Sequence, residues 1–177
     1  MMRHPILHRL LILLGVLVLL SVAYAVEGPP PVSETVPVNA EVKPYVKVTV
    51  LSFPMNLGTF TGAANEERGP ADNAVFRVQT NADVNLTFSG GDLTHVSNPA
   101  YKIKTAYKAW TSGGVDLGYF NRSLPGYSPV GDLIVSPGQS AGTTVYYGIM
   151  GWAKTGEIWE QIGGDYSATI TLTVWTP

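Results

Sequence analysis

The residues with the clearest catalytic spacing in this 177-residue chain form the run GQSAG, residues 138–142. In hydrolases with a G-x-S-x-G motif, a strand precedes the serine, a helix follows it and a histidine comes later in the chain. Here TTVYYGIM, a β-branched and aromatic run typical of a strand, follows Ser140, and His95 lies upstream of it. The run is therefore predicted to be a turn between two strands.

Two further places carry residue types that bind metals. His95 stands alone, and one histidine without cysteine or a second histidine makes no transition-metal site, so we expect it at the surface or at a strand end. The run ANEERGPADN, residues 64–73, includes Glu66 and Asp72, whose oxygen atoms suit Ca²⁺. Because Arg68 lies among them and no D-x-D-x-D-G spacing is present, we expect a solvated polar loop, with no metal and no cofactor.

Glu157 and Glu160 come nearest to the carboxylate pair of a sugar hydrolase, which needs two acids converging in a cleft. Three residues apart in TGEIWEQIGG, they are expected to be ordinary surface charges, and the protein is predicted not to be an enzyme. A converging pair would instead favour a secreted hydrolase. Trp152 and Trp159 lie beside them in the sequence, and exposed rings there would stack on sugars. A secreted carbohydrate-binding module is therefore the alternative function.

Two triplets, NLT at Asn85 and NRS at Asn121, match the acceptor pattern for N-glycosylation. Asn85 alternates with Val84 and Leu86, which are expected to be buried. Its side chain is therefore expected to face outward.

The first 25 residues have the three parts of a secretory signal peptide. Arg3 and Arg9 are followed by the apolar run of residues 10–20 and by the small-x-small pattern AYA at residues 23–25. Cleavage there predicts a secreted protein, at the cell surface or outside the cell, that meets the membrane only through this peptide. An uncleaved anchor is the rival, although the apolar run falls just short of the ~20 residues that span a bilayer.

The remaining composition excludes several classes of protein. Without Arg3 and Arg9 the chain has 9 basic and 13 acidic residues, and no basic patch is wide enough for a nucleic-acid backbone. Cysteine is absent, which removes disulfides, thiolate metal sites and a cysteine nucleophile. Residues 26–34, VEGPPPVSE, are predicted to be an extended Pro-rich linker, and residues 35–177 a single domain.

From Thr35 onward the apolar period is two, which predicts strands with one buried face. The clearest later strands are expected at residues 74–80, 83–89, 101–110, 131–136, 143–150 and 166–175. Runs such as SGGD, SNPA and TSGGVD separate them, and no segment has a helical period with caps. Many short strands with Gly/Pro turns predict an all-β fold, an antiparallel immunoglobulin-like or jelly-roll β-sandwich.

The first alternating stretch, residues 36–50, is too long for one strand of one domain. Fifteen residues would extend about 50 Å, whereas a domain of this size is roughly 40 Å across. Pro44 divides the stretch and removes a ladder donor. Either residues 35–43 and 45–51 are two strands of one sandwich, or residues 35–43 leave the domain and complete a neighbour's sheet.

A signal peptide, an extended N-terminus, VKVTV, FRVQTNADVNLTFSGGDL and a closing GGDYSATITLTV together resemble exported immunoglobulin-like β-sandwich subunits. These include fimbrial and spore-coat-type subunits and the biofilm-matrix fibre subunits of bacteria and archaea. The resemblance implies a head-to-tail homopolymer assembled by donor-strand exchange, with a role in adhesion or biofilm. The plugs of the donated strand would be Val36, Val38, Ala40 and Val42. The partners expected are a second copy of the chain and a polysaccharide or the cell surface.

Overall fold

The computed structural model describes residues 37, 39–52, 54–70, 73–125 and 128–177. The chain divides into two units, Met1–Glu41 and Val42–Pro177. In the first unit the described residues, Pro37 and 39–41, are exposed and belong to no strand. The predicted signal peptide and Pro-rich linker lie outside the described residues. Within the described ranges, no helix has the length and apolar character to cross a membrane.

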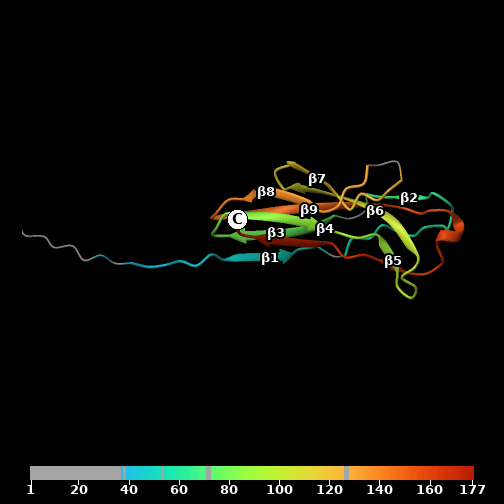
Figure 1. The fold of residues 1–177 in the computed structure, drawn as a ribbon, viewed down its shortest axis with the longest axis horizontal. Coiled ribbons are helices and arrows are strands. Elements are labelled where there is room, and N and C mark those ends of the chain that lie inside the picture. Colours follow the sequence, from blue (N-terminus) through green and yellow to red (C-terminus); the bar gives the residue numbers. More distant parts are fainter. Residues whose placement is uncertain (1–36, 38, 53, 71–72, 126–127) are drawn as a thin grey trace, which may run out of the picture. The chain divides into compact units, whose positions relative to one another are not determined.

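The second unit consists of antiparallel strands in two sheets (Figure 1). The larger sheet runs β1 (Val46–Val50), β3 (Ala74–Thr80), β9 (Thr143–Lys154), β6 (Lys102–Thr111), β5 (Leu93–His95), β10 (Tyr166–Ser167). Two more strands join it, β2 (Glu67–Arg68) beside β9 and β7 (Asp116–Phe120) beside β6. The smaller sheet runs β11 (Thr171–Trp175), β4 (Val84–Ser89), β8 (Leu133–Gln139). A 3₁₀ turn, η1, spans Ile158–Glu160.

The core lies between the sheets because alternate residues of the strands in each sheet point toward the other sheet. Its fully buried large side chains include Phe88 and Leu86 from the smaller sheet and Tyr147 and Phe120 from the larger one. The ring of Phe88 lies 5.8 Å from that of Tyr147 and 6.0 Å from that of Phe120, at angles favourable for aromatic packing. The prediction of an all-β fold with packed antiparallel sheets is confirmed.

Two short turns carry the chain from one sheet to the other. Residues 81–83 join β3 to β4, and residues 140–142 of the GQSAG run join β8 to β9. The Asp83 carboxylate accepts a hydrogen bond from the backbone N–H of Ala141 at 2.8 Å, so the two turns brace each other. Gly138 and Gln139 of the run end β8, and the rest of it is a turn between strands, as predicted.

The expected last strand, residues 166–175, is two strands in two different sheets. Tyr166 and Ser167 pair with β5 in the larger sheet, whereas Thr171 begins the pairing with β4 in the smaller one. Residues 168–170 carry the chain from one sheet to the other. Even alternation does not reveal such a switch, because each half of the run keeps a period of two.

Candidate functional site at the open flank of the sandwich

The strand β1 forms one edge of the larger sheet, where β3 is its one partner among the described residues. Val48 lies opposite Val78 and Val50 lies opposite Phe76. Residues directly opposite each other in an antiparallel pair share a face of the sheet. Because Val78 and Phe76 are core residues, Val48 and Val50 also face inward.

These inward-facing residues of β1 are nevertheless exposed. Val48 retains 41% and Val50 retains 61% of its accessible surface, whereas Val78 beside them retains none. Val46, at the start of the strand, does pack against the core. The inner face of β1 is therefore covered at one end and open along the rest.

The edge strand of the smaller sheet, β11, shows a similar pattern. Leu172 lies opposite Phe88 and Val174 opposite Leu86, so both side chains face the core. Both are half-buried, as is Ile170 just before the strand. One side of β11 pairs with β4 and the other side pairs with no strand of the described chain.

The exposed sides of β1 and β11 belong to the same flank of the sandwich. On the opposite flank β8 lies over β7, since a methyl group added to Gly118 would be 3.4 Å from Leu133 Cδ1. β4 has β8 on that side and therefore has β11 on the side of β1. We call this surface the open flank; its residues are Val46, Val48, Val50, Ile170, Leu172 and Val174.

The residues that lead into β1 are fixed by one side chain, Asn81. Its Nδ2 donates to the carbonyl of Lys43 at 3.0 Å, its Oδ1 accepts from the N–H of Tyr45, and its own N–H donates to the Tyr45 carbonyl at 3.1 Å. Lys43 and Tyr45 thus continue the line of β1 past the end of β3. Pro44, between them, has no N–H to leave unpaired.

Of the four residues predicted to plug a neighbouring groove, Val36 and Val38 lie outside the described residues. Ala40 is exposed, and Val42 retains 80% of its surface. Residues 39–45 belong to no strand.

A scan of family models and a search of curated proteins found no match to the chain. The functional argument therefore starts from the geometry of the flank.

The two tryptophans of the sugar-binding alternative have different surroundings. Trp152, in β9, is half-buried, and its ring lies 6.1 Å from the ring of Tyr119. The Arg122 guanidinium lies over the other ring, that of Tyr119, at 5.0 Å. Trp159, in η1, retains 76% of its surface. Trp159 therefore presents a free ring, whereas much of the Trp152 side chain is already in contact with protein.

Asn85 lies on the outer face of the smaller sheet, as the alternation predicts, because it is opposite Trp175, but its side chain is buried there and not exposed. It retains 5% of its surface, because β4 is the middle strand of its sheet and β8 folds over it. The register between β4 and β8 shifts beside Asn85, and a methyl group added to Gly138 would lie 3.1 Å from the Asn85 Cα. A buried amide is a poor acceptor for a glycan in the folded protein.

The second acceptor triplet is part of a hydrogen-bond network around Asp92, which the sequence does not reveal. Asp92 Oδ1 accepts from the N–H of Thr105 at 3.0 Å, from the Ser123 hydroxyl and from Asn121 Nδ2 at 3.4 Å, while Oδ2 accepts from Lys104 Nζ at 3.2 Å. Asn121 Nδ2 also donates to the Thr105 hydroxyl at 2.7 Å. Both ends of the triplet, Asn121 and Ser123, are thus committed to internal bonds.

The charge on Asp92 is stabilised by these donors. Burial alone raises the pKa of its carboxyl, but the bonds from Ser123, Thr105 and Lys104 outweigh burial and hold that pKa below its ordinary value. The carboxylate therefore stays ionised and joins β6 to the turn after β7.

Among the remaining acidic candidates, Asp72 lies outside the described residues, and the others have structural partners. Glu160 accepts from the N–H of Glu157 at 2.9 Å, so this pair caps the η1 turn. The Glu66 carboxylate accepts from the N–H of Thr61 at 2.7 Å and pairs with Arg68. Across the described ranges, no group of three or more His, Asp or Glu side chains is placed to hold a metal ion.

His95 ends strand β5, as expected, but it is buried and not at the surface. It retains 7% of its area, and its Nδ1 accepts from the N–H groups of Ser97 and Asn98 at 3.2 and 3.0 Å. This arrangement places the ring proton on Nε2, which donates to the carbonyl of Gly163 at 3.3 Å. His95 is thus a link between β5 and the loop before β10.

Proposed function

We propose that the protein is a structural, non-catalytic cell-surface subunit that assembles into a filament by donor-strand complementation and supports adhesion or biofilm. The donated segment is residues 35–43, with Val36, Val38, Ala40 and Val42 directed into the open flank of the next copy. In this proposal the domain is an immunoglobulin-like or jelly-roll sandwich that lacks one strand.

The observation that carries the proposal is the exposure of Val48 and Val50 on the inner face of an edge strand. Burying an exposed valine side chain is worth about 1.5 kcal/mol or more, so a sandwich that leaves two of them open gains from an added strand. The free side of β11 offers the backbone groups that such a strand needs.

The donor segment matches that opening in pattern and in length. Its apolar residues alternate with Pro37, Asn39 and Glu41, which suits a strand with one face on a core and one face in water. Residues 36–42 would extend about 20 Å, and the five residues of β11 extend about 17 Å. A strand paired to β11 would lay its valines across Val48 and Val50.

The hydrogen bonds of Asn81 favour donation to a second copy. They hold Lys43 and Tyr45 in line with β1, so the chain would have to reverse direction before Lys43 to enter its own flank. Donation from each copy to the next is a heterologous contact, which builds an open filament and not a closed ring.

The acceptor half of the proposal is tested by charge placed in the flank. The double substitution Val48→Asp and Val50→Asp should abolish filaments in negative-stain microscopy and leave a monomer in sedimentation. Lys47→Asp is the matched control, because Lys47 lies next to Val48 in the strand but points to the outer face of the sheet. Filaments formed equally well by the Val48/Val50 variant would disprove the assigned groove.

The donor half is tested by Val38→Asp in the full chain, with Asn39→Asp as the matched control on the opposite face of the segment. A synthetic peptide of residues 33–43 should also cap growing filaments and slow assembly. Wild-type protein that stays monomeric at every concentration would overturn the function itself. Filaments that survive Val38→Asp would overturn the donated strand alone.

A further inference from the structure

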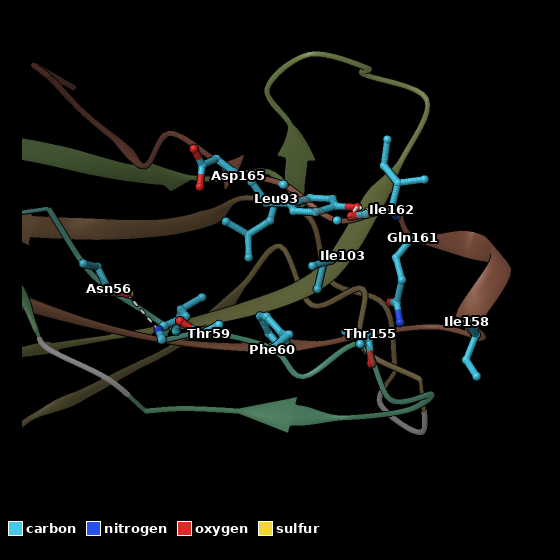
Figure 2. Close-up of a pocket in the computed structure, with 17 residues that line it drawn as sticks. Asn56, Thr59, Phe60, Leu93, Ile103, Thr155, Ile158, Gln161, Ile162 and Asp165 are labelled. Carbon is cyan, nitrogen blue, oxygen red and sulfur yellow. Dashed lines mark hydrogen bonds between the residues drawn. The ribbon is translucent and has the colours of Figure 1, made fainter.

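A second recess lies away from the open flank, at the end of the larger sheet that carries β5 and β10. It is a cavity of about 600 Å³ between residues 55–62, which follow β1, and residues 155–166, which follow β9 (Figure 2). Leu93 of β5 and Ile103 of β6 form part of its wall. This volume lies in the range of about 300–1,000 Å³ typical of pockets that bind small molecules.

The loop on one side of the cavity is held in place before any ligand arrives. Tyr166 donates its hydroxyl proton to the carbonyl of Ile162 at 2.9 Å and accepts from the Ile162 N–H at 3.0 Å. The Tyr166 ring packs edge-on against His95 at 5.0 Å. Gly164 has φ +144°, and a methyl group there would lie 2.3 Å from His95 Nε2, so glycine is required for this approach.

The 3₁₀ turn at the mouth of the cavity is braced in the same way. Glu157 and Glu160 cap each other, and Asn65 Nδ2 donates to the Glu157 carboxylate at 3.4 Å. The turn places Ile158 in the wall and leaves the ring of Trp159, one residue later, 76% exposed. A largely exposed aromatic side chain therefore lies one residue along the chain from the wall of the recess.

The polar atoms of the cavity define what it can bind. Gln161 lines it, and Figure 2 shows the side chain reaching toward Thr155 beside Phe60. The Nε2 of Gln161 donates to the Ala63 carbonyl at 3.4 Å, whereas its buried Oε1 receives no hydrogen bond from the described residues. A buried acceptor without a donor is rare in folded proteins, and a ligand hydroxyl would supply the donor.

The charges exclude acidic ligands. Asp165 is the one charged side chain among the described residues that line the cavity, and it is acidic. With no lysine or arginine in the wall, nothing there neutralises a phosphate, sulfate or carboxylate. Phe60, Leu93 and Ile103 supply apolar surface beside the Gln161 amide. Neutral sugar rings combine hydroxyl donors with apolar C–H faces and fit both properties.

We infer that this cavity binds one unit of a neutral polysaccharide, with Gln161 Oε1 accepting from a sugar hydroxyl and Trp159 stacking on the adjoining unit. The site is separate from the open flank, so it does not depend on the assembly proposed above. Sugar binding in this cavity would attach a cell-surface subunit directly to a matrix or cell-wall glycan.

The experiment titrates the purified full chain with neutral hexasaccharides of glucose, mannose and xylose and with an anionic uronic-acid hexasaccharide, by calorimetry. Binding of at least one neutral sugar is expected, with no binding of the anionic one. Gln161→Leu and Trp159→Ala should each weaken that binding about tenfold, because one leaves a sugar hydroxyl unpaired and the other removes the stacked ring.

Trp175→Ala is the matched control, since Trp175 is an exposed tryptophan of β11 in the other sheet. It should leave binding unchanged. Trp159→Ala removes a side chain that is mostly in water, so it keeps the test valid even if Gln161→Leu folds poorly. Failure of every neutral sugar to bind, equal binding of the anionic sugar, or binding that neither variant weakens would overturn the inference.

Discussion

The two flanks of the sandwich are finished in different ways. On the β7–β8 flank, Phe120 is completely buried, and Leu117, Leu133 and Val135 pack against the core. We call this surface, with these four residues, the closed flank. On the open flank, β1 turns Val48 and Val50 inward to the same core layer and leaves them largely in water. The strand pattern is alike on both sides. The difference lies in whether an element covers the inward face.

Polar bonding reinforces this contrast. Near the closed flank, the Asp92 carboxylate accepts hydrogen bonds from Thr105 of β6 and from Ser123 in the turn after β7. In β1, Thr49 points to the face of the sheet opposite Val48 and Val50, and its buried hydroxyl oxygen has no hydrogen-bond partner among the described residues. Hydrogen bonds of Asp92 thus stabilise one flank, whereas the other flank leaves apolar side chains exposed, which is where the proposed association would take place.

The strongest test of the closed flank is Phe120→Ala. The substitution removes a fully buried ring that packs at 5.3 Å from Tyr107, and we expect the free energy of unfolding to fall by about 3–5 kcal/mol. Urea denaturation followed by tryptophan fluorescence measures this. A loss below about 1 kcal/mol would show that the flank is not closed as described.

The next effect concerns the Asp92 network. Asp92→Ala removes the carboxylate that the Thr105 N–H and the Ser123 hydroxyl share, so that they keep only the bonds to each other at 3.3 and 3.1 Å, and a loss of about 2–3 kcal/mol is expected in the same assay. Asp132→Ala, at an exposed aspartate in the loop before β8, is the control and should change stability by less than about 0.5 kcal/mol.

The charge of Asp92 makes part of this stability depend on pH. Because the folded-state pKa lies below the ordinary 3.8, the contribution is complete above about pH 4 and is lost as the pH falls through the folded pKa. The stability gap between wild type and Asp92→Asn should therefore narrow as the pH is lowered from 7 to 3. A gap that stays constant or widens over this range would contradict the role given to the carboxylate.

The smallest effect on folding is expected at the open flank. Val50→Thr keeps the β-branched shape of a side chain that is 61% exposed, so the free energy of unfolding of the monomer should change by less than about 0.5 kcal/mol. The same change should raise the protein concentration needed for filaments, measured by light scattering. An equal effect on the stability of the monomer and on assembly would contradict the different roles given to the two flanks.

The sequence predicts the repeating parts of the fold well. Alternation places residues 74–80 in a strand whose bounds match β3, and the run from Thr143 begins β9 at the same residue. Period-two patterning is a local property that each strand carries by itself. The short strands β2, β5 and β7 were not anticipated, because two to five residues are too few to show a period.

The candidate sites depend on pairing between distant segments, which the sequence does not show. Val48 is exposed because no strand of the described part of the chain covers β1 there, and no pattern within VKVTV predicts this. The burial of Asn85 and of His95 follows from β8 and from the loop at Gly163 folding over them. The apolar alternation of residues 36–42 is the local signal on which the proposed donor strand rests, and it can be read from the sequence alone.

The bonds of Asn81 have a mechanical consequence. Tension on the segment before Lys43 would enter the domain at Asn81, next to the end of β3, and would then run along the axis of β1. Force applied along a strand loads all of its ladder hydrogen bonds together, whereas force applied across it breaks them one after another. The paired residues Val46–Val50 would therefore resist pulling as a group. In the proposed filament, the segments that join neighbouring copies would therefore extend before the domains unfold.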